Sequence, residues 1–152
     1  MDCIFCDIVK GSVPCHKIWE NDEHLAFLSI FPNTKGFSVV ITKEHISSYA
    51  FGQEDQILTK LILATKSVAL LLDESLDGVG RTGMFFEGYG IDHLHSKLFP
   101  MHGTGNKSDF KKNESKINKY FYFYEGYISS HDYSKADHEE LDELAKLIRN
   151  IK

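Results

Sequence analysis

Residues 90–100 read GIDHLHSKLFP, and polar side chains alternate with apolar ones along this segment. Residues two apart on an extended strand share a face, so His93, His95 and Lys97 are predicted to lie on one face of a sheet. Two imidazoles and an ammonium are poor core material, because each must be hydrogen-bonded or solvated when it is covered. The row therefore indicates a site that handles phosphate or a metal ion.

The segments around this row predict an α+β domain. Apolar and β-branched residues separated by short turns predict strands at 16–20, 24–30, 37–42, 82–87 and 92–99. Short turns between neighbouring strands favour antiparallel pairing. Apolar residues recur with a helical period over 54–73, which predicts a long amphipathic helix packed on one face of the sheet.

The C-terminal part has a different composition. Residues 104–119 are rich in Lys, Asn and Ser and predict a mobile surface connection. Residues 120–127 are strongly aromatic and predict a strand that packs against the domain or a second subunit. A helix is predicted at 137–150. We therefore expect residues 104–152 to form a C-terminal extension on the same single domain as residues 1–103.

Length, charge and cysteine content restrict the class of protein. A chain of 152 residues most simply forms one domain. A net charge of -5 gives no support for binding along a nucleic-acid backbone. Three cysteines fit a reducing compartment better than a disulfide framework. With no leader-like segment and no run approaching ~18 apolar residues, we expect a cytoplasmic protein without a nucleic-acid polymer or a membrane as partner.

Several separated segments resemble the histidine triad (HIT) superfamily. They are CIFCDIVKGSVP at 3–14, the strand at 25–28, the turn at 32–36, VVITKEHI at 39–46 and HLHSKLF at 93–99. The last resembles the signature His-φ-His-φ-His-φ-φ, where φ is apolar, and the match covers residues 1–103. The resemblance implies a HIT-like fold, namely a five-stranded antiparallel half-barrel packed with the long helix, here with a C-terminal strand and helix extension. It also implies a homodimer.

The resemblance implies a nucleotide hydrolase or transferase. It assigns the nucleophile to His95, which would attack the α-phosphate of a nucleoside phosphoramidate or dinucleoside polyphosphate and form a covalent nucleotidyl-histidine. Lys97 occupies the place of the third histidine, and its ammonium can neutralise phosphate oxygens. Where the leaving group needs a proton, Lys97 would have to give up its own, or His102 would have to supply it. His93 completes the candidate catalytic set.

The nucleotide contacts are less well defined, because the chain departs from the family pattern. Ser29 stands where the family has an acidic residue that holds the ribose, Phe37 where it has a histidine, and Phe86 where it has an asparagine. The candidate contacts are apolar side chains that could form a slot for a base, although such residues more often belong to an ordinary core, and one hydroxyl for a sugar: Phe5, Ile8, Phe27, Ile30 and Ser29.

A structural zinc ion is the second chemical expectation. Cys3, Cys6 and His45 match positions that bind structural zinc in some family members, and His93 is the expected fourth ligand. Two thiolates and two imidazoles form a closed tetrahedral set suited to Zn²⁺. The alternative is a pair of small buried thiols, with His45 capping a short turn.

Two other functions are compatible with the sequence. The absent third histidine, together with Ser29 and Phe86, fits a non-catalytic nucleotide-binding or adaptor protein. Alternatively, His93, His95 and His102 supply three imidazoles for a catalytic zinc ion with one open position.

Overall fold

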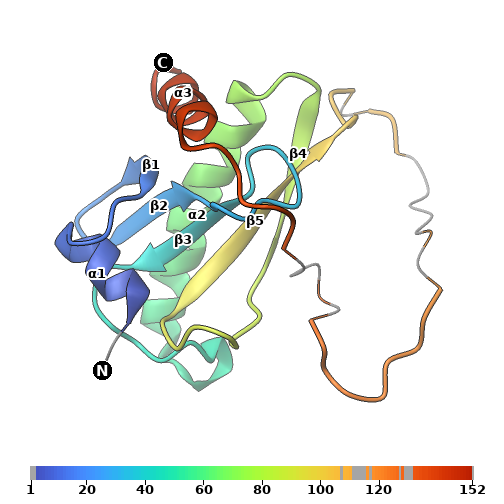
Figure 1. Cartoon of the computed structure of the whole chain (residues 1–152). Coiled ribbons are helices and arrows are strands. Elements are labelled where there is room, and N and C mark those ends of the chain that lie inside the picture. Colours follow the sequence, from blue (N-terminus) through green and yellow to red (C-terminus); the bar gives the residue numbers. More distant parts are fainter. Residues whose placement is uncertain are drawn as a thin grey trace.

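A computed structural model describes residues 3–106, 108–110, 116, 118–126, 128 and 132–151. Its centre is a five-stranded sheet with the strand order β1-β2-β3-β5-β4, in which every neighbouring pair is antiparallel (Figure 1). The strands are β1 (His16–Glu20), β2 (His24–Leu28), β3 (Ser38–Thr42), β4 (Val79–Phe85) and β5 (His95–His102). The predicted α+β class and the five-stranded antiparallel sheet are confirmed.

The helices cover both faces of this sheet. They are α1 (Ile4–Lys10), α2 (Asp55–Ser75) and α3 (His138–Arg149), and a short 3-10 turn, η1 (Ala50–Gly52), precedes α2. The long helix α2 lies across one face, and α1 lies against the other (Figure 1). Within the described ranges, none of the helices has the length and hydropathy that a membrane-spanning helix requires.

Alternation along the central strands produces two separate apolar cores. Ala26 and Val40 face α2 and belong to the larger core, whereas Phe27 and Ile41 face α1 and belong to the smaller one. Side chains of a strand point to opposite faces in turn, so a continuous apolar strand is buried on both sides. The sheet is therefore a central layer with no solvent-facing side at β2 and β3.

The C-terminal helix α3 belongs to the larger core. Asp137 caps its first turn by accepting hydrogen bonds from the backbone N–H groups of Glu139 and Glu140. Its inner face buries Leu141, Ala145 and Ile148 in the core that α2 also lines. The division of the chain near residue 103 stays a prediction, and this shared core supports the view that the extension is packed on the same domain.

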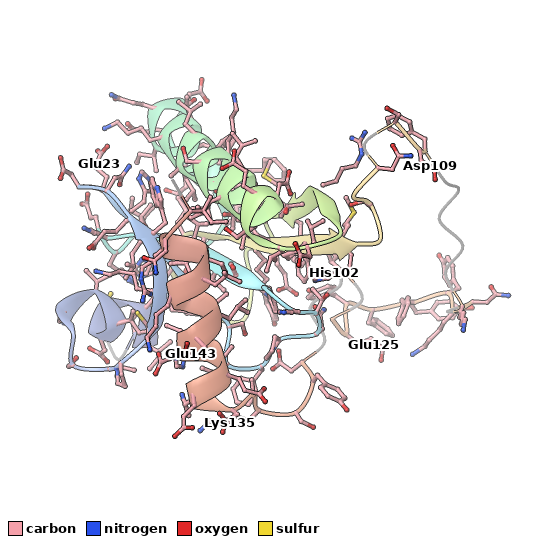
Figure 2. The ribbon with its side chains drawn as sticks, turned by 90° about the horizontal axis from the view of Figure 1, so that it is seen from above. Glu23, His102, Asp109, Glu125, Lys135 and Glu143 are labelled. Atoms are coloured by element: carbon pink, nitrogen blue, oxygen red, sulfur yellow. The ribbon has the colours of Figure 1, made fainter. Side chains whose placement is uncertain are left out.

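The predicted aromatic strand at 120–127 is wrong for the residues that the structure describes. Residues 120–126 contain no strand, and Tyr122 and Phe123 are each 86% exposed. Residue 127 lies outside the described part of the chain, as do 107, 111–115 and 117 of the preceding connection. High β propensity reflects packing against a neighbouring strand, and no strand of the sheet pairs with this segment. Figure 2 shows Asp109 on a loop that extends away from the sheet.

The hairpin between β4 and β5 also differs from its predicted position. β5 begins at His95 instead of residue 92. The residues just before His95 do not pair with β4, and one of them is hydrogen-bonded to the loop after β3. Asp92 accepts hydrogen bonds from the Ser47 hydroxyl and the Ser48 backbone N–H, at 2.9 and 2.8 Å. The loop that follows β4 is consequently longer than a tight turn, and it reaches over the surface that His95 occupies.

Docking of α3 predicts a measurable stability difference between two neighbouring residues. Ile148 is fully buried in the larger core, whereas Leu147 is half exposed. The Ile148→Ala variant is expected to lose about 2 to 5 kcal/mol of unfolding free energy, because it leaves a cavity. Leu147→Ala is expected to stay within about 0.5 kcal/mol of the parent. Urea denaturation measures both, and equal losses would contradict the docked position of α3.

Candidate active site and metal cluster

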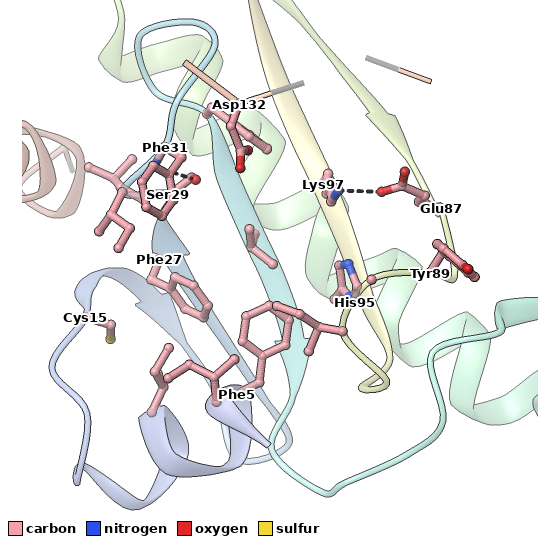
Figure 3. Close-up of a pocket in the computed structure, with 18 of the residues that line it drawn as sticks. Phe5, Cys15, Phe27, Ser29, Phe31, Glu87, Tyr89, His95, Lys97 and Asp132 are labelled. Atoms are coloured by element: carbon pink, nitrogen blue, oxygen red, sulfur yellow. Dashed lines mark hydrogen bonds and ion pairs between the residues drawn. The ribbon is translucent and has the colours of Figure 1, made fainter. Parts of the chain in front are cut away.

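A cavity of about 660 Å³ lies between α1, the sheet and the loop that follows β4. This volume is within the range of pockets that hold a small organic ligand. All five predicted nucleotide contacts line it: Phe5, Ile8, Phe27, Ile30 and Ser29. Figure 3 shows Phe27 and Phe31 on one side of the cavity and His95 and Lys97 of β5 on the other. The structure therefore brings the predicted apolar slot and the predicted catalytic strand to one place.

His95 lies in this cavity wall in a fixed orientation. Its Nδ1–H donates a hydrogen bond of 2.6 Å to the backbone carbonyl of His93, and its ring meets the Phe5 ring edge-on with centroids 5.4 Å apart. A carbonyl only accepts, so Nδ1 carries the proton and Nε2 carries the lone pair in the neutral ring. Burial lowers the pKa of His95, and the nearby Lys97 charge acts in the same direction. The ring is thus held neutral with a nucleophilic nitrogen at the cavity.

Lys97 lies on the same face as His95, as the alternation predicts, and it is held by a carboxylate. Its Nζ is 2.5 Å from Oε2 of Glu87, and the two side chains are only 18% and 8% exposed (Figure 3). Lys97 also lies 5.7 Å from the centroid of the Phe85 ring. Both members of the pair line the cavity, so a buried ion pair stands directly beside the nucleophile candidate.

Sequence reasoning did not identify Glu87 as a site residue. One signal was available, because a lysine on a buried strand face needs a counter-charge. Glu87 is the acidic residue of the predicted strand at 82–87, which is the hairpin partner of β5. In the structure it follows the end of β4, where Phe85 pairs with Lys97 in the sheet register.

Residues distant in sequence complete the cavity wall. Tyr89 lies in the loop after β4, and its ring meets that of Tyr124 edge-on at 5.9 Å. Asp132 also lines the cavity, beside Phe31 and Ser29 (Figure 3). No motif in the sequence points to these positions. Tyr89 lies in a loop, and Tyr124 and Asp132 of the C-terminal segment reach the cavity through tertiary packing.

A second cluster lies next to His93. The ligand atoms of Cys3, Cys6, His45 and His93 are all within 4.8 Å of one another. α1 accounts for the pairing of the cysteines, because Cys3 caps the helix and Cys6 follows one turn later. His45 follows β3, and its Nδ1 is 3.3 Å from Sγ of Cys6. The four predicted zinc ligands are therefore brought together.

The orientation of His93 fits a metal ligand. Its Nε2–H donates to the Thr42 backbone carbonyl at 2.7 Å, which leaves Nδ1 as the nitrogen that faces the sulfur atoms. A hydrogen bond to the second ring nitrogen is the arrangement that fixes the tautomer of metal-bound histidine. Two sulfurs and two imidazole nitrogens are also the donor set of closed structural zinc sites. The residues present thus permit a zinc ion.

His102 is not brought to the cavity. It lies at the far end of β5, where its Nε2–H donates to the Lys35 backbone carbonyl at 2.9 Å. The rings of His93 and His95 are engaged with different partners. Among the described residues, the Cys3 cluster is the single group with the spacing of a metal site. The structure consequently does not support a catalytic zinc ion held by the three histidines.

The departures from the family pattern have structural roles here. Phe37 is buried and stacks on Phe99 with ring centroids 4.6 Å apart. Phe86 packs against the larger core. The Ser29 hydroxyl accepts a hydrogen bond from the backbone N–H of Phe31 at 3.1 Å while it lines the cavity. Phe37 and Phe86 therefore take part in packing, and Phe37 also lines the cavity.

Comparison with known proteins agrees with this geometry. The model of the HIT domain matches residues 10–103. An uncharacterized HIT-like protein of Mycoplasma genitalium is 36% identical over 121 residues, which are 77% of this chain and 84% of that protein. Adenosine 5′-monophosphoramidase of Schizosaccharomyces pombe is 35% identical over 100 residues, 66% of this chain and 74% of that protein.

The fold is similar to that of solved structures over almost the whole chain. The crystal structure of a Zn-bound histidine triad family protein from Mycobacterium smegmatis has a TM-score of 0.68 at 21% identity, covering 98% of this chain and 91% of that one. The fold similarity and the family match are thus in agreement. The chain belongs to the HIT domain family.

Proposed function

We propose that this protein is a nucleotide hydrolase or nucleotidyl transferase that acts through a covalent nucleotidyl-His95. The observation that carries the proposal is the His95 ring, anchored through Nδ1 and held neutral in the wall of a largely apolar cavity of about 660 Å³. The expected substrates are nucleoside phosphoramidates or dinucleoside polyphosphates. The similarity to an adenosine 5′-monophosphoramidase supports a nucleotide substrate.

The proposed reaction has two displacement steps. In the first, the Nε2 lone pair of His95 forms a bond to the α-phosphorus, and the bond from phosphorus to the leaving group breaks with its electron pair on that group. In the second, water attacks the same phosphorus, the bond to Nε2 breaks, and a nucleoside monophosphate is released with the water proton lost to solvent. Covalent catalysis of this kind replaces one difficult displacement with two easier ones.

The cavity supports a definite placement of the substrate. The aromatic wall of Phe5 and Phe27 fits a nucleobase, and the Ser29 hydroxyl fits a sugar hydroxyl. The Lys97 ammonium lies beside the nucleophile, where it would attract the non-bridging oxygens of the α-phosphate. His93 acts as a positioning residue, because its carbonyl holds the His95 ring.

The covalent intermediate is the decisive test. After acid quenching with diadenosine tetraphosphate or an adenosine phosphoramidate, intact-mass measurement is expected to show an adenylyl adduct on the protein. His95→Ala is expected to lose the adduct and at least about 1,000-fold in turnover. His102→Asn, a histidine change outside the cavity, is expected to retain both. Nucleotide binding without adduct or turnover would favour the non-catalytic binding or adaptor function instead.

We propose that Cys3, Cys6, His45 and His93 bind a structural zinc ion. The convergence of their ligand atoms and the zinc-bound state of the similar Mycobacterium smegmatis protein support this assignment. The ion would connect α1 to β3 and the start of β5, and so stabilise the wall that carries Phe5. All three cysteines are free of disulfides, which supports a location in the reducing cytoplasm.

Metal analysis tests the zinc assignment. Protein prepared with zinc and then desalted is expected to hold about one zinc ion per chain, as four-coordinate structural sites do. Cys6→Ser is expected to lose that zinc and to lower the melting temperature. Cys15→Ser is the matched control, because Cys15 lies outside the cluster, and it is expected to retain the metal. Parent protein that elutes without zinc would contradict the assignment.

We propose that the protein is a homodimer formed through α2. Leu63 and Leu70 are two turns apart on this helix and are 58% and 51% exposed. Apolar side chains that share an exposed helix face favour association.

Light scattering tests the dimer. The parent is expected at twice the chain mass of 17.4 kDa and Leu70→Lys at the monomer mass. The control is Leu147→Lys on α3, because Leu147 is as exposed as Leu70, and this variant is expected to stay dimeric. A monomeric parent would contradict the proposal.

A further inference from the structure

We propose that this site selects nucleotides whose leaving group departs as a stable oxyanion, such as a phosphate from a phosphoanhydride, over those that release an amine. The inference rests on the proposed function and specifies its substrate class. It follows from the ion pair between Lys97 and Glu87, which lines the same cavity as His95.

The Lys97 ammonium is engaged by a carboxylate. Lys97 Nζ and Glu87 Oε2 are 2.5 Å apart, and both side chains are largely buried. Neutralising one member of such a pair would leave the other as an uncompensated buried charge, which is strongly unfavourable. An ammonium also gives up a proton far less readily than an imidazolium, whose reference pKa is about four units lower. Lys97 therefore supplies a fixed positive charge and is a poor proton donor.

The two classes of leaving group make opposite demands on this residue. When a P–N bond breaks, its electron pair goes to nitrogen, and the amine leaves readily only if an acid protonates that nitrogen. When a phosphoanhydride P–O bond breaks, the electron pair goes to an oxygen that is stable as an anion. That step needs no proton, and a fixed cation beside the departing oxygen stabilises the developing charge.

Among the described residues that line the cavity, the other titratable groups are poorly placed to replace this acid. Glu125 is more than half exposed and forms an ion pair with Lys119. Cys15 lies on the wall across from His95 (Figure 3). His102 is bonded to the Lys35 carbonyl and does not line the cavity. Asp132 lines it beside Phe31 and Ser29, away from His95 (Figure 3). Tyr89 lies near Glu87 but is 70% exposed (Figure 3). Within the described cavity, the electrostatics thus favour an anionic leaving group.

Both substrate classes form the same adenylyl-His95 intermediate. A difference between their rates of adduct formation therefore reports how readily each leaving group departs. In single-turnover experiments, the parent is expected to react with diadenosine tetraphosphate at least about 100-fold faster than with an adenosine 5′-N-alkylphosphoramidate, the usual contribution of one general acid. Lys97→His is expected to shift this ratio toward the amidate by at least about 10-fold. Lys60→His is the matched control and is expected to leave the ratio unchanged, because Lys60 forms a 2.5 Å pair with Glu23 outside the cavity.

A second measurement covers the case in which Lys97→His does not fold. With adenosine 5′-aryl phosphates of graded phenol acidity, the parent is expected to show a steep dependence of adduct formation on leaving-group pKa. Lys97→Gln is expected to slow every ester and to make this dependence steeper.

Equal parent rates on the anhydride and the amidate, an unchanged ratio in a folded Lys97→His variant, or a flat dependence on leaving-group pKa would each overturn the inference. The proposed function would survive those results as long as the adduct forms on His95. Absence of an adduct from every substrate would overturn both.

Discussion

The hydrogen bond from His95 Nδ1 to the His93 carbonyl is the contact on which the candidate site depends. It is 2.6 Å long and joins two residues of one short segment, so the local backbone alone sets the tautomer and the direction of the ring. The same segment positions His93 for the cysteine cluster through a separate bond to Thr42. The orientation of the candidate nucleophile and the approach of His93 to the two cysteines are therefore two results of a single backbone conformation at the start of β5.

This arrangement makes the N-terminal helix part of the site. Cys3 directly precedes α1 and Cys6 lies in its first turn, and both belong to the cluster. Phe5 of α1 lines the cavity, and its ring contacts both His93 and His95. A helix of only seven residues has little stability of its own. Its position depends on tertiary packing against β2 and β3, and a zinc ion bound by its cysteines would add a covalent-like restraint at the same point.

Much of the site could be predicted because its pattern is local. The two-residue period of β5 is visible in the printed sequence, and it correctly places His95 and Lys97 opposite Leu98. The Lys97 and Glu87 pair could not be assigned with the same ease, because it depends on the register of β4 against β5 and on the loop beyond it. The strand predicted at 120–127 is wrong for a different reason. The β propensity of this segment is high, but no strand of the sheet pairs with its described residues.

The double-sided burial of the central sheet has a consequence for how this protein can change over evolution. Ser96 is fully buried and shares a 2.7 Å hydrogen bond with Thr65 of α2, on the opposite side of β5 from the cavity. A single inserted or deleted residue at the start of β5 would exchange the two faces, moving an imidazole and an ammonium into the aliphatic layer. Insertions and deletions are therefore tolerable in the surface loops, whereas β5 can change only by substitution of its residues.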